Sequence, residues 1–280
     1  MWMMAGAIFL GCKWLTFRRA SRGLRSYPLS RAFGYLVLWP GMDAANFLRS
    51  GSARAPRAEF GDSPNSCRGL QNLGRVARDS TRVACAPILK MIFGAVLVFV
   101  LARHATNPLL AGWIGMIGLI FILHFGLFDL TAIAWRAVGV QARPIMNAAI
   151  RATSLTDFWG RRWNGAFNQL FLEIFFVRLA RKLGTVRATL TAFLVSGLIH
   201  ELVISLPAGA GYGLPTGYFL LQGWGIVTQR SPLGKRWGMR RGVRGWVFTM
   251  ALTAGPAVFL FHPPFVWRVV LPFMQAIGAL

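Results

Sequence analysis

The chain has 280 residues, of which 55% are hydrophobic and only 14% are charged. A soluble domain usually has about a quarter of its residues charged, so this composition excludes an ordinary soluble protein and predicts an integral, multi-pass membrane protein. The formal net charge of +23 raises the question of nucleic-acid binding, but the arginines lie in the connections between apolar runs. That distribution is typical of anchoring at anionic headgroups, so we expect membrane lipids and no nucleic acid as partners.

Apolar runs that reach or approach the roughly 20 residues of a spanning helix occur along much of the chain. They cover residues 2–17, 86–102, 108–135, 184–206, 213–229, 245–262 and 265–280. We therefore predict an all-α polytopic membrane protein with about seven transmembrane helices. The first run has no basic residue before its apolar part and is followed by Arg18 and Arg19, which predicts a retained span rather than a secretory signal.

The charges of the connections predict the orientation of these spans. The connection 207–212 carries no charge and is expected outside, whereas 178–187 and 230–244 are strongly basic and are expected in the cytoplasm. Extending this alternation places the N-terminus outside and the C-terminus in the cytoplasm, across a plasma or inner membrane.

Two segments do not fit the alternation as spans. In 31–48, Pro40 and Gly41 interrupt any helix, so we expect a re-entrant or interfacial segment there. In 165–180, Glu173 and Arg178 predict an amphipathic interfacial helix between two cytoplasmic stretches.

The chain shows no internal repeat, so we expect residues 1–280 to form a single membrane domain. Residues 50–85 are predicted to be a polar, basic cytoplasmic loop that is partly disordered. The motifs that carry chemistry lie within 150–206. The three cysteines, Cys12, Cys67 and Cys85, are widely spaced and belong to no CxxC or Cys/His cluster, so neither a zinc site nor a disulfide framework is expected.

His200 and Glu201 stand within an otherwise apolar run, 190–206. Ionisable side chains at membrane depth persist mainly where they face a polar cavity or a partner. Ser196 and Gly197 lie one helical turn earlier and leave space beside the imidazole, and Ser196 could hydrogen-bond to it. An imidazole of ordinary pKa can accept a proton at neutral pH, which suits a general base.

Other interpretations of this pair stay open. The imidazole could be a core histidine satisfied by a neighbouring helix, and Glu201 could be a supporting carboxylate or an ion-pair partner. Metal binding is disfavoured, because an HExxH zinc site would need a histidine where this chain has Ile204.

A second constellation is Ser154-Leu-Thr-Asp-Phe-Trp-Gly-Arg-Arg-Trp-Asn-Gly-Ala-Phe-Asn168. Ser154 with Asp157 three residues later predicts a helix start, and Asp157 with Arg161 predicts an i,i+4 ion pair. Arg161 and Arg162 can bind phosphates, either of lipid headgroups or of a nucleotide.

On a continuous helix, the same segment would present two different faces. Trp159 and Trp163 would share one face, as in an interfacial aromatic belt. Gly160, Asn164 and Asn168 would share another, able to line a polar cavity. An aromatic belt flanked by arginines would need no catalytic role, and this alternative also stays open.

Taken together, the two motifs resemble the membrane-bound O-acyltransferase family, in the branch related to plant wax synthases. The resemblance rests on Ser154-Leu-x-Asp-Phe-Trp-Gly-Arg-Arg-Trp-Asn164 followed by Ser196-Gly-Leu-Ile-His-Glu-Leu202. His124-Phe-Gly-Leu-Phe-Asp129 and the segment Pro263 to Phe273 are also similar to that branch. The resemblance covers roughly residues 86–280 and, weakly, Trp39 to Asp43.

The resemblance implies transfer of an acyl group from acyl-CoA to a hydroxyl of a lipid, such as a long-chain alcohol, inside a membrane tunnel. His200 matches the family's catalytic histidine, and Asn164 matches the asparagine of its Trp-Asn motif. The expected substrate-binding residues are Trp159, Arg161, Arg162, Trp163, Asn168, Ser196 and Glu201. The candidates for holding the CoA phosphates are Arg161, Arg162, Arg181 and Lys182. No bound cofactor is expected, because acyl-CoA is the donor substrate.

Two alternative functions remain at this point. One is transfer of a short acyl group to a cell-surface or secreted hydroxyl. The other, from a different class, is a membrane transporter or scaffold that uses His200 and Glu201 as a proton site. Oligomeric state and the acceptor alcohol do not follow from the sequence.

Overall fold

The computed structural model describes residues 2–24, 26–48, 85–172 and 176–280, and every regular element in these ranges is helical. The predicted all-α class is therefore confirmed. The loop predicted at 50–85, except Cys85, lies outside the described residues. Glu173 of the predicted amphipathic helix lies outside them too.

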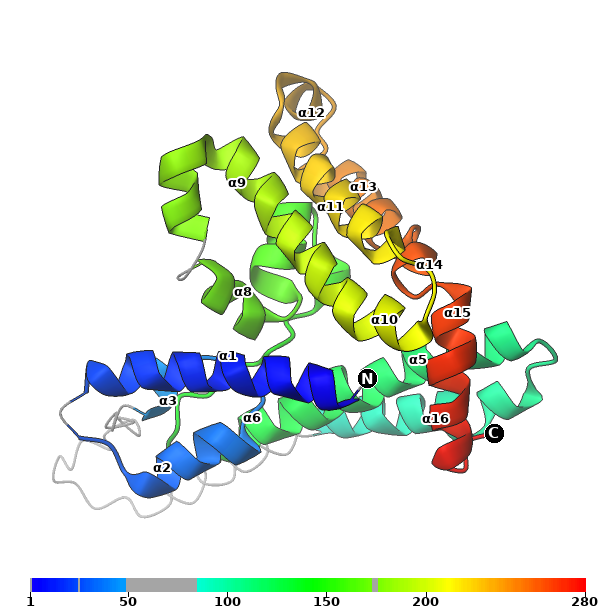
Figure 1. The fold of residues 1–280 in the computed structure, drawn as a ribbon, viewed down its shortest axis with the longest axis horizontal. Helices are drawn as coiled ribbons and strands as arrows, with labels where there is room; N and C mark the ends of the chain where they lie inside the picture. Colours follow the sequence, from blue (N-terminus) through cyan, green and yellow to red (C-terminus); the bar gives the residue numbers. More distant parts are fainter. Residues whose placement is uncertain (1, 25, 49–84, 173–175) are drawn as a thin grey trace, which may run out of the picture.

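The N-terminal part and the central helices come first in the chain (Figure 1). They are α1 (Trp2–Arg22), α2 (Leu29–Phe33), a π-helical turn (Gly34–Leu38), α3 (Ala44–Leu48), the helical stretch Cys85–His104, α5 (Pro108–Ile122), a π-helical turn (Leu123–Leu127) and α6 (Phe128–Ala137). A short 3₁₀ turn (Ala149–Arg151), α7 (Leu155–Asp157), a π-helical turn (Phe158–Arg162) and α8 (Gly165–Phe171) follow.

The C-terminal half is built from two long helices and a series of shorter ones. They are α9 (Val177–His200), a π-helical turn (Glu201–Ser205), α10 (Leu206–Ala208), α11 (Leu214–Arg230), α12 (Pro232–Arg236), α13 (Gly242–Ala254), α14 (Ala257–Leu260), α15 (Pro263–Phe265), a π-helical turn (Val266–Val270) and α16 (Leu271–Ala276).

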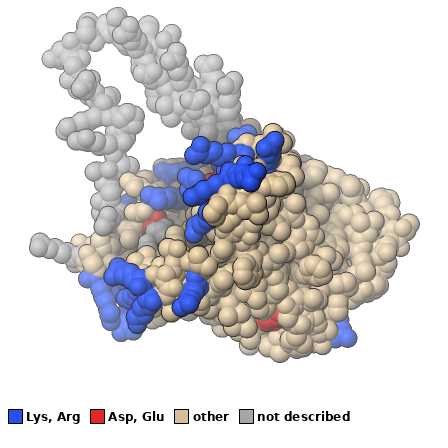
Figure 2. Space-filling model, turned by 90° about the horizontal axis from the view of Figure 1, so that it is seen from above, with Lys and Arg blue, Asp and Glu red and all other residues tan. Residues whose placement is uncertain are grey.

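Four helical stretches in the described residues are long and apolar enough to cross a membrane. They are Cys85–His104, Pro108–Ala137, Val177–Ala208 and Gly242–Leu260. Only 22% of the most apolar window of each is buried inside the protein, so most of these residues are at least partly exposed, as lipid contact requires. Figure 2 is consistent with lipid contact: on the face that it shows, Lys and Arg gather in a few groups, and a broad area carries almost no charge. The chain is an integral membrane protein.

The expected count of about seven spans is not confirmed. The predicted spans 2–17, 213–229 and 265–280 are helical but are not among the four stretches. The reasons are visible in the sequence: α1 carries Lys13 and several arginines, and α11 has 17 residues. The C-terminal run is divided among α15, a π-helical turn and α16.

One predicted interruption is confirmed, and a second interruption was not predicted. Helical structure ends at Leu38 and resumes at Ala44, so no helix passes through Pro40 and Gly41. In α9, Gly184 has φ 76° and ψ 162°, a conformation open to glycine, and kinks the helix where the span 184–206 was expected to begin.

Helix α9 and helix α11 run side by side and share the most extensive contact between described elements (Figure 1). The main hydrophobic core joins α11 to α5 and to the C-terminal helices, and a second core gathers α1, α2 and α3 against α6. Trp159 packs against the main core and also against a third, smaller cluster that includes Phe158. The motif 154–168 is therefore fixed against α11.

Candidate active site

His200 ends the regular part of α9, and its ring is held from two sides. Its Nδ1 lies 2.7 Å from the backbone carbonyl oxygen of Ser196, one turn earlier. Because a carbonyl oxygen only accepts hydrogen bonds, the neutral imidazole carries its proton on Nδ1. Nε2 therefore keeps the lone pair that a general base needs.

An aromatic wall connects His200 with the motif 154–168. The ring of Phe219, on α11, lies 4.3 Å from the ring of His200 between centroids. The ring centroids of Trp159 and Phe219 lie 5.6 Å apart, and the indole Nε1 of Trp159 donates to Oε1 of Gln222, 3.3 Å away. Both predicted motifs thus meet on α11, through side chains that the motifs themselves do not contain.

Glu201 contacts the first turn of α11. Its Oε1 accepts hydrogen bonds from the backbone N–H groups of Gly213 and Thr216, both at 3.0 Å, and from the Thr216 hydroxyl at 2.8 Å. None of the ion pairs among the described residues includes Glu201. The structure thus gives Glu201 hydrogen-bond partners on α11, whereas its expected contact with substrate stays a prediction.

The start of the second motif forms as expected. The Ser154 hydroxyl accepts a hydrogen bond from the Asp157 N–H at 3.1 Å and caps α7. Asp157 pairs with Arg161 at 3.1 Å, which confirms the predicted i,i+4 ion pair. It also pairs with Arg162 at 2.5 Å, a contact that the helical spacing did not predict.

The second half of the motif departs from the prediction. The helix breaks at Trp163, which is extended, and at Asn164, which has φ 48°. The prediction that Gly160, Asn164 and Asn168 share one face of a continuous helix was therefore wrong, as was the shared face of Trp159 and Trp163. The physical reason is that Asn tolerates the left-handed conformation and its side chain can start a new helix.

Asn164 and its neighbours are positioned by this break. The Asn164 N–H points to the Met146 sulfur at 3.2 Å, and its Oδ1 accepts from the Phe167 N–H at 3.4 Å, at the start of α8. The Asn168 amide donates to the Gly160 carbonyl at 2.5 Å, which folds α8 back onto the π-helical turn. None of these hydrogen bonds reaches His200, so the catalytic role expected of Asn164 stays a prediction.

Trp163 lies on the other side of the motif from Trp159. It stacks on Phe158, with ring centroids 5.5 Å apart and planes 11° apart. Its opposite neighbour is His124 of the π-helical turn before α6, at 6.4 Å and 13°. The predicted Trp-Asn motif and the His124 segment are thereby brought together.

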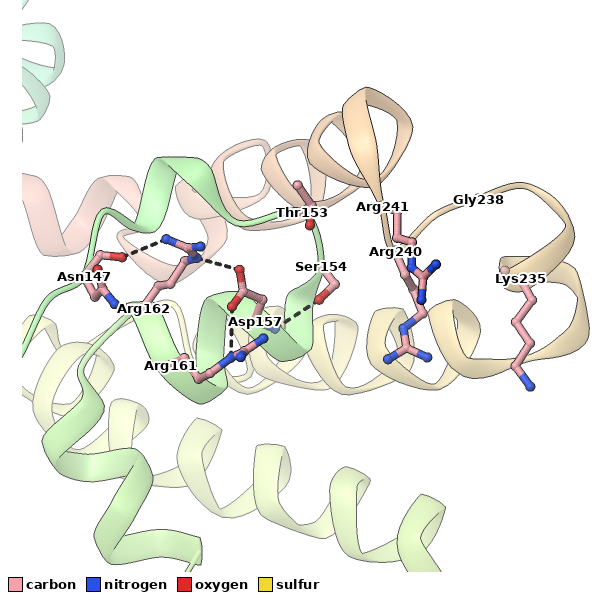
Figure 3. Close-up of a pocket in the computed structure, with 11 residues that line it drawn as sticks. Asn147, Thr153, Ser154, Asp157, Arg161, Arg162, Lys235, Gly238, Arg240 and Arg241 are labelled. Carbon is pink, nitrogen blue, oxygen red and sulfur yellow. Dashed lines mark hydrogen bonds and ion pairs between the residues drawn. The ribbon is translucent and has the colours of Figure 1, made fainter.

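A basic cleft of about 790 Å³ opens beside the motif (Figure 3). Its lining includes one carboxylate and five cationic side chains: Asp157, Arg161, Arg162, Lys235, Arg240 and Arg241. In Figure 3 the arginines of the motif reach toward Asp157, while the basic side chains of the 235–241 connection stand across from them. Such a group of cations on a partly open cleft suits a polyanionic ligand.

The cleft is lined by more cationic residues than the sequence predicted. The sequence predicted Lys235, Arg240 and Arg241 only as part of a strongly basic cytoplasmic connection. Their positive charge is the one property in the sequence that could have indicated a role in the cleft. Burial and then the positive charge of Arg240 lower the pKa of Arg230 nearby, which indicates crowding of cations. Arg181 and Lys182, predicted to hold phosphates, are exposed on α9 and do not line the cleft.

The cleft and His200 lie at different levels of α11. Gln229 accepts from the Leu155 N–H at 2.9 Å beside the cleft, whereas Phe219 contacts His200. Ten residues at 1.5 Å each separate these levels by about 15 Å along the helix. Among the described residues, no group of three or more His, Cys, Asp or Glu is placed to hold a metal ion.

Comparisons with known proteins show which family this part of the chain is similar to. Residues 142–221, which include both Asn164 and His200, match the profile of the membrane bound O-acyl transferase family. This part of the chain is therefore similar to that family, and the resemblance to its wax synthase-like branch is confirmed.

Curated relatives carry more particular names. The chain is 32% identical over 142 residues to a probable long-chain-alcohol O-fatty-acyltransferase 7 of Arabidopsis thaliana, covering 45% of this chain and 41% of the relative. It is 32% identical over 159 residues to a long-chain-alcohol O-fatty-acyltransferase of Simmondsia chinensis, covering 50% and 44%. An acyl-CoA–sterol O-acyltransferase 1 of Arabidopsis thaliana is 30% identical over 48% of this chain and 42% of its own length. The chain thus spans about half the length of the curated relatives it matches.

Proposed function

We propose that this chain is an acyl-CoA-dependent O-acyltransferase that esterifies the hydroxyl of a lipid alcohol, with His200 as the general base. The observation that carries the proposal is the hydrogen bond from His200 Nδ1 to the Ser196 carbonyl, within the segment that matches the family. That bond fixes the tautomer in which Nε2 is free to accept a proton.

The reaction needs little beyond this base and a donor for the developing oxyanion, because a thioester is already activated. The alcohol oxygen attacks the thioester carbonyl carbon while Nε2 of His200 takes the hydroxyl proton. The C–S bond then breaks, and the imidazole returns the proton to the departing thiolate, which leaves the ester and free CoA. The Asn164 amide, oriented through its Oδ1 contact with the Phe167 N–H, is the proposed hydrogen-bond donor to the oxyanion.

The acyl donor would bind with its charged end in the basic cleft. Five cationic side chains there match the phosphates of CoA in charge, and the level of His200 is about 15 Å further along α11. The flexible arm of CoA would then pass Trp159 and Phe219 toward the base. Trp163, Asn168 and Ser196 would shape that path, and an internal tunnel that the acceptor enters from lipid is part of the proposal.

The acceptor class follows from the relatives, whose names specify long-chain alcohols in two cases and a sterol in the third. We therefore propose a lipid hydroxyl without choosing between these acceptors. In orientation, the basic connection 230–244 that supplies part of the cleft would face the cytoplasm, where acyl-CoA is made. The seven-span topology, with the N-terminus outside, belongs to this proposal too.

The experiment is ester formation by the purified chain from labelled palmitoyl-CoA with a long-chain alcohol or a sterol. Loss of a general base is expected to lower kcat by about 10²- to 10⁴-fold in a His200→Ala variant. His104→Ala is the matched control, because His104 lies in an exposed 3₁₀ turn (Leu101–His104) away from the site.

The outcomes separate the alternatives. Equal turnover by the parent and a folded His200→Ala variant would refute the base assignment. Turnover of acetyl-CoA with a water-soluble acceptor, and none with lipid alcohols, would favour the short-chain reaction instead. Proton-dependent flux in vesicles without consumption of acyl-CoA would point to the transporter alternative.

A further inference from the structure

Glu201 follows His200 directly in the chain, yet its carboxylate is engaged by a different helix. A single oxygen, Oε1, accepts three hydrogen bonds from the start of α11: the Gly213 N–H, the Thr216 N–H and the Thr216 hydroxyl. The other oxygen, Oε2, is buried and has no hydrogen-bond partner in the described part of the chain. The carboxylate thus lies at the positive end of a 17-residue helix, where a negative charge is stabilised by the unpaired N–H groups and the helix dipole.

The helix held in this way also carries the ring that contacts His200. Phe219 lies three residues after Thr216, on the same side of α11, and its ring centroid is 4.3 Å from that of His200. The contacts form a closed circuit: His200 to Glu201 through the chain, Glu201 to Thr216, Thr216 to Phe219 along the helix, and Phe219 back to His200.

Helices α9 and α11 also pack closely beside these contacts. Gly197 of α9 lies against Thr216, since a Cβ atom added there would come within 2.7 Å of the Thr216 Cα. The backbones of α9 and α11 therefore approach each other as closely as a glycine allows, one turn before Glu201. Glu201 and Gly197 together determine how closely α9 and α11 approach each other where they cross.

We infer that Glu201 is a positioning residue: its carboxylate anchors the N-terminus of α11 and thereby holds Phe219 against the catalytic ring of His200. This inference rests on the proposed acyl transfer for its catalytic consequence. Glu201 exchanges no proton with substrate, and its role is to accept hydrogen bonds. An uncharged side chain of the same shape that keeps the acceptor oxygen should therefore preserve most of the role.

The activity test compares Glu201→Gln with Glu201→Ala, using labelled palmitoyl-CoA and a long-chain alcohol. Glu201→Ala is expected to lower kcat roughly 10- to 100-fold through misplacement of the base, with little change in the KM for acyl-CoA, whose cleft lies further along α11. Glu201→Gln should retain activity within about 5-fold of the parent and should keep the parent's pH profile. A Gln variant as inactive as the Ala variant, or an Ala variant as active as the parent, would overturn the inference.

A second measurement reads the anchoring contact without using the reaction. Thermal unfolding midpoints in detergent are measured for Glu201→Ala, Thr216→Val and the double variant. The two losses should be non-additive, because both substitutions remove the hydrogen bond from the Thr216 hydroxyl to Glu201. Thr191→Val is the matched control: its hydroxyl bonds only within α9, to the Arg187 carbonyl, so its loss should add to that of Glu201→Ala.

The two measurements distinguish the two possible failures. A parent chain that forms no ester, combined with non-additive midpoints, would refute the proposed function while leaving the anchor of α11 in place. Additive midpoints would refute the anchor whatever the activity shows.

Discussion

Gly197 of α9 lies directly against Thr216 of α11, and a Cβ atom at position 197 would come within 2.7 Å of the Thr216 Cα. The neighbouring atom belongs to the backbone, so no side-chain rotation can relieve that contact. The absence of a side chain at this one position lets α9 and α11 pack closely enough for the contacts of Glu201 and His200 to form.

A Gly197→Ala substitution should therefore force α9 and α11 apart. Overpacking of this kind costs about 1–3 kcal/mol, and we expect the thermal unfolding midpoint and kcat to fall together. Gly217→Ala is the control. Gly217 lies within α11, away from its ends, and a Cβ atom added there would meet no other atom within 4 Å. That control should be neutral or should stabilise by up to about 1 kcal/mol. Equal midpoints for the two variants would contradict the close crossing.

The sequence predicted the long apolar helices because their signal is local. Composition and run length are sufficient for stretches such as Val177–Ala208, and even the kink at Gly184 falls where the span was expected to begin. The shorter helices were less predictable, since whether α1 or α11 crosses the membrane depends on what surrounds it.

The site was predicted only where its parts are close in the chain. Ser154, Asp157 and Arg161 interact over three or four residues, and helical spacing is enough to pair them. The break at Asn164 depends on a left-handed backbone conformation that periodicity does not reveal. Contacts of α11 with the motif join residues 63 and 74 positions apart, so no local pattern could indicate them.

Arg161 and Arg162 both pair with Asp157, but they should respond differently to substitution. The Arg162 side chain is 24% exposed and also donates to the backbone carbonyl of Asn147 at 3.2 Å, whereas the Arg161 side chain is 78% exposed. Arg162→Ala leaves the partly buried Oδ2 of Asp157 without its donor and should destabilise the protein by about 1–3 kcal/mol. An exposed pair contributes little, so Arg161→Ala should change stability by less than about 0.5 kcal/mol. Unfolding midpoints in detergent check this order, and the reverse order would contradict it.

The basic cleft should bind acyl-CoA mainly through charge. Arg240 lines the cleft, so Arg240→Glu should raise the KM for acyl-CoA roughly 10-fold at low salt, with kcat nearly unchanged. The increase should shrink as ionic strength rises, because salt screens the interaction. Arg236→Glu is the matched control, since Arg236 is an exposed cation of the same connection that does not line the cleft. Initial rates at several salt concentrations measure both, and an equal effect of the two substitutions would exclude the cleft as the binding site.

Gln222 occupies a fully buried position on α11 and links two parts of the protein that are remote in the chain. Its Oε1 accepts from the Trp159 indole at 3.3 Å, and its Nε2 donates to the Leu252 carbonyl at 2.7 Å. Gln222→Leu keeps the approximate volume but leaves a partly buried donor and a partly buried acceptor unpaired. The expected loss of stability is about 1–3 kcal/mol for each group left unsatisfied, measured by unfolding in detergent.

The same substitution should also affect the reaction, because the Trp159 indole packs against Phe219 and so helps to fix the wall beside His200. A lower kcat with an unchanged KM for acyl-CoA is expected, since the basic cleft does not contain Gln222. Gln275→Leu, at an exposed position of α16, serves as the control for the change in side chain alone. If Gln222→Leu raised KM and left kcat intact, the wall formed by Trp159 and Phe219 would belong to donor binding rather than to the placement of the base.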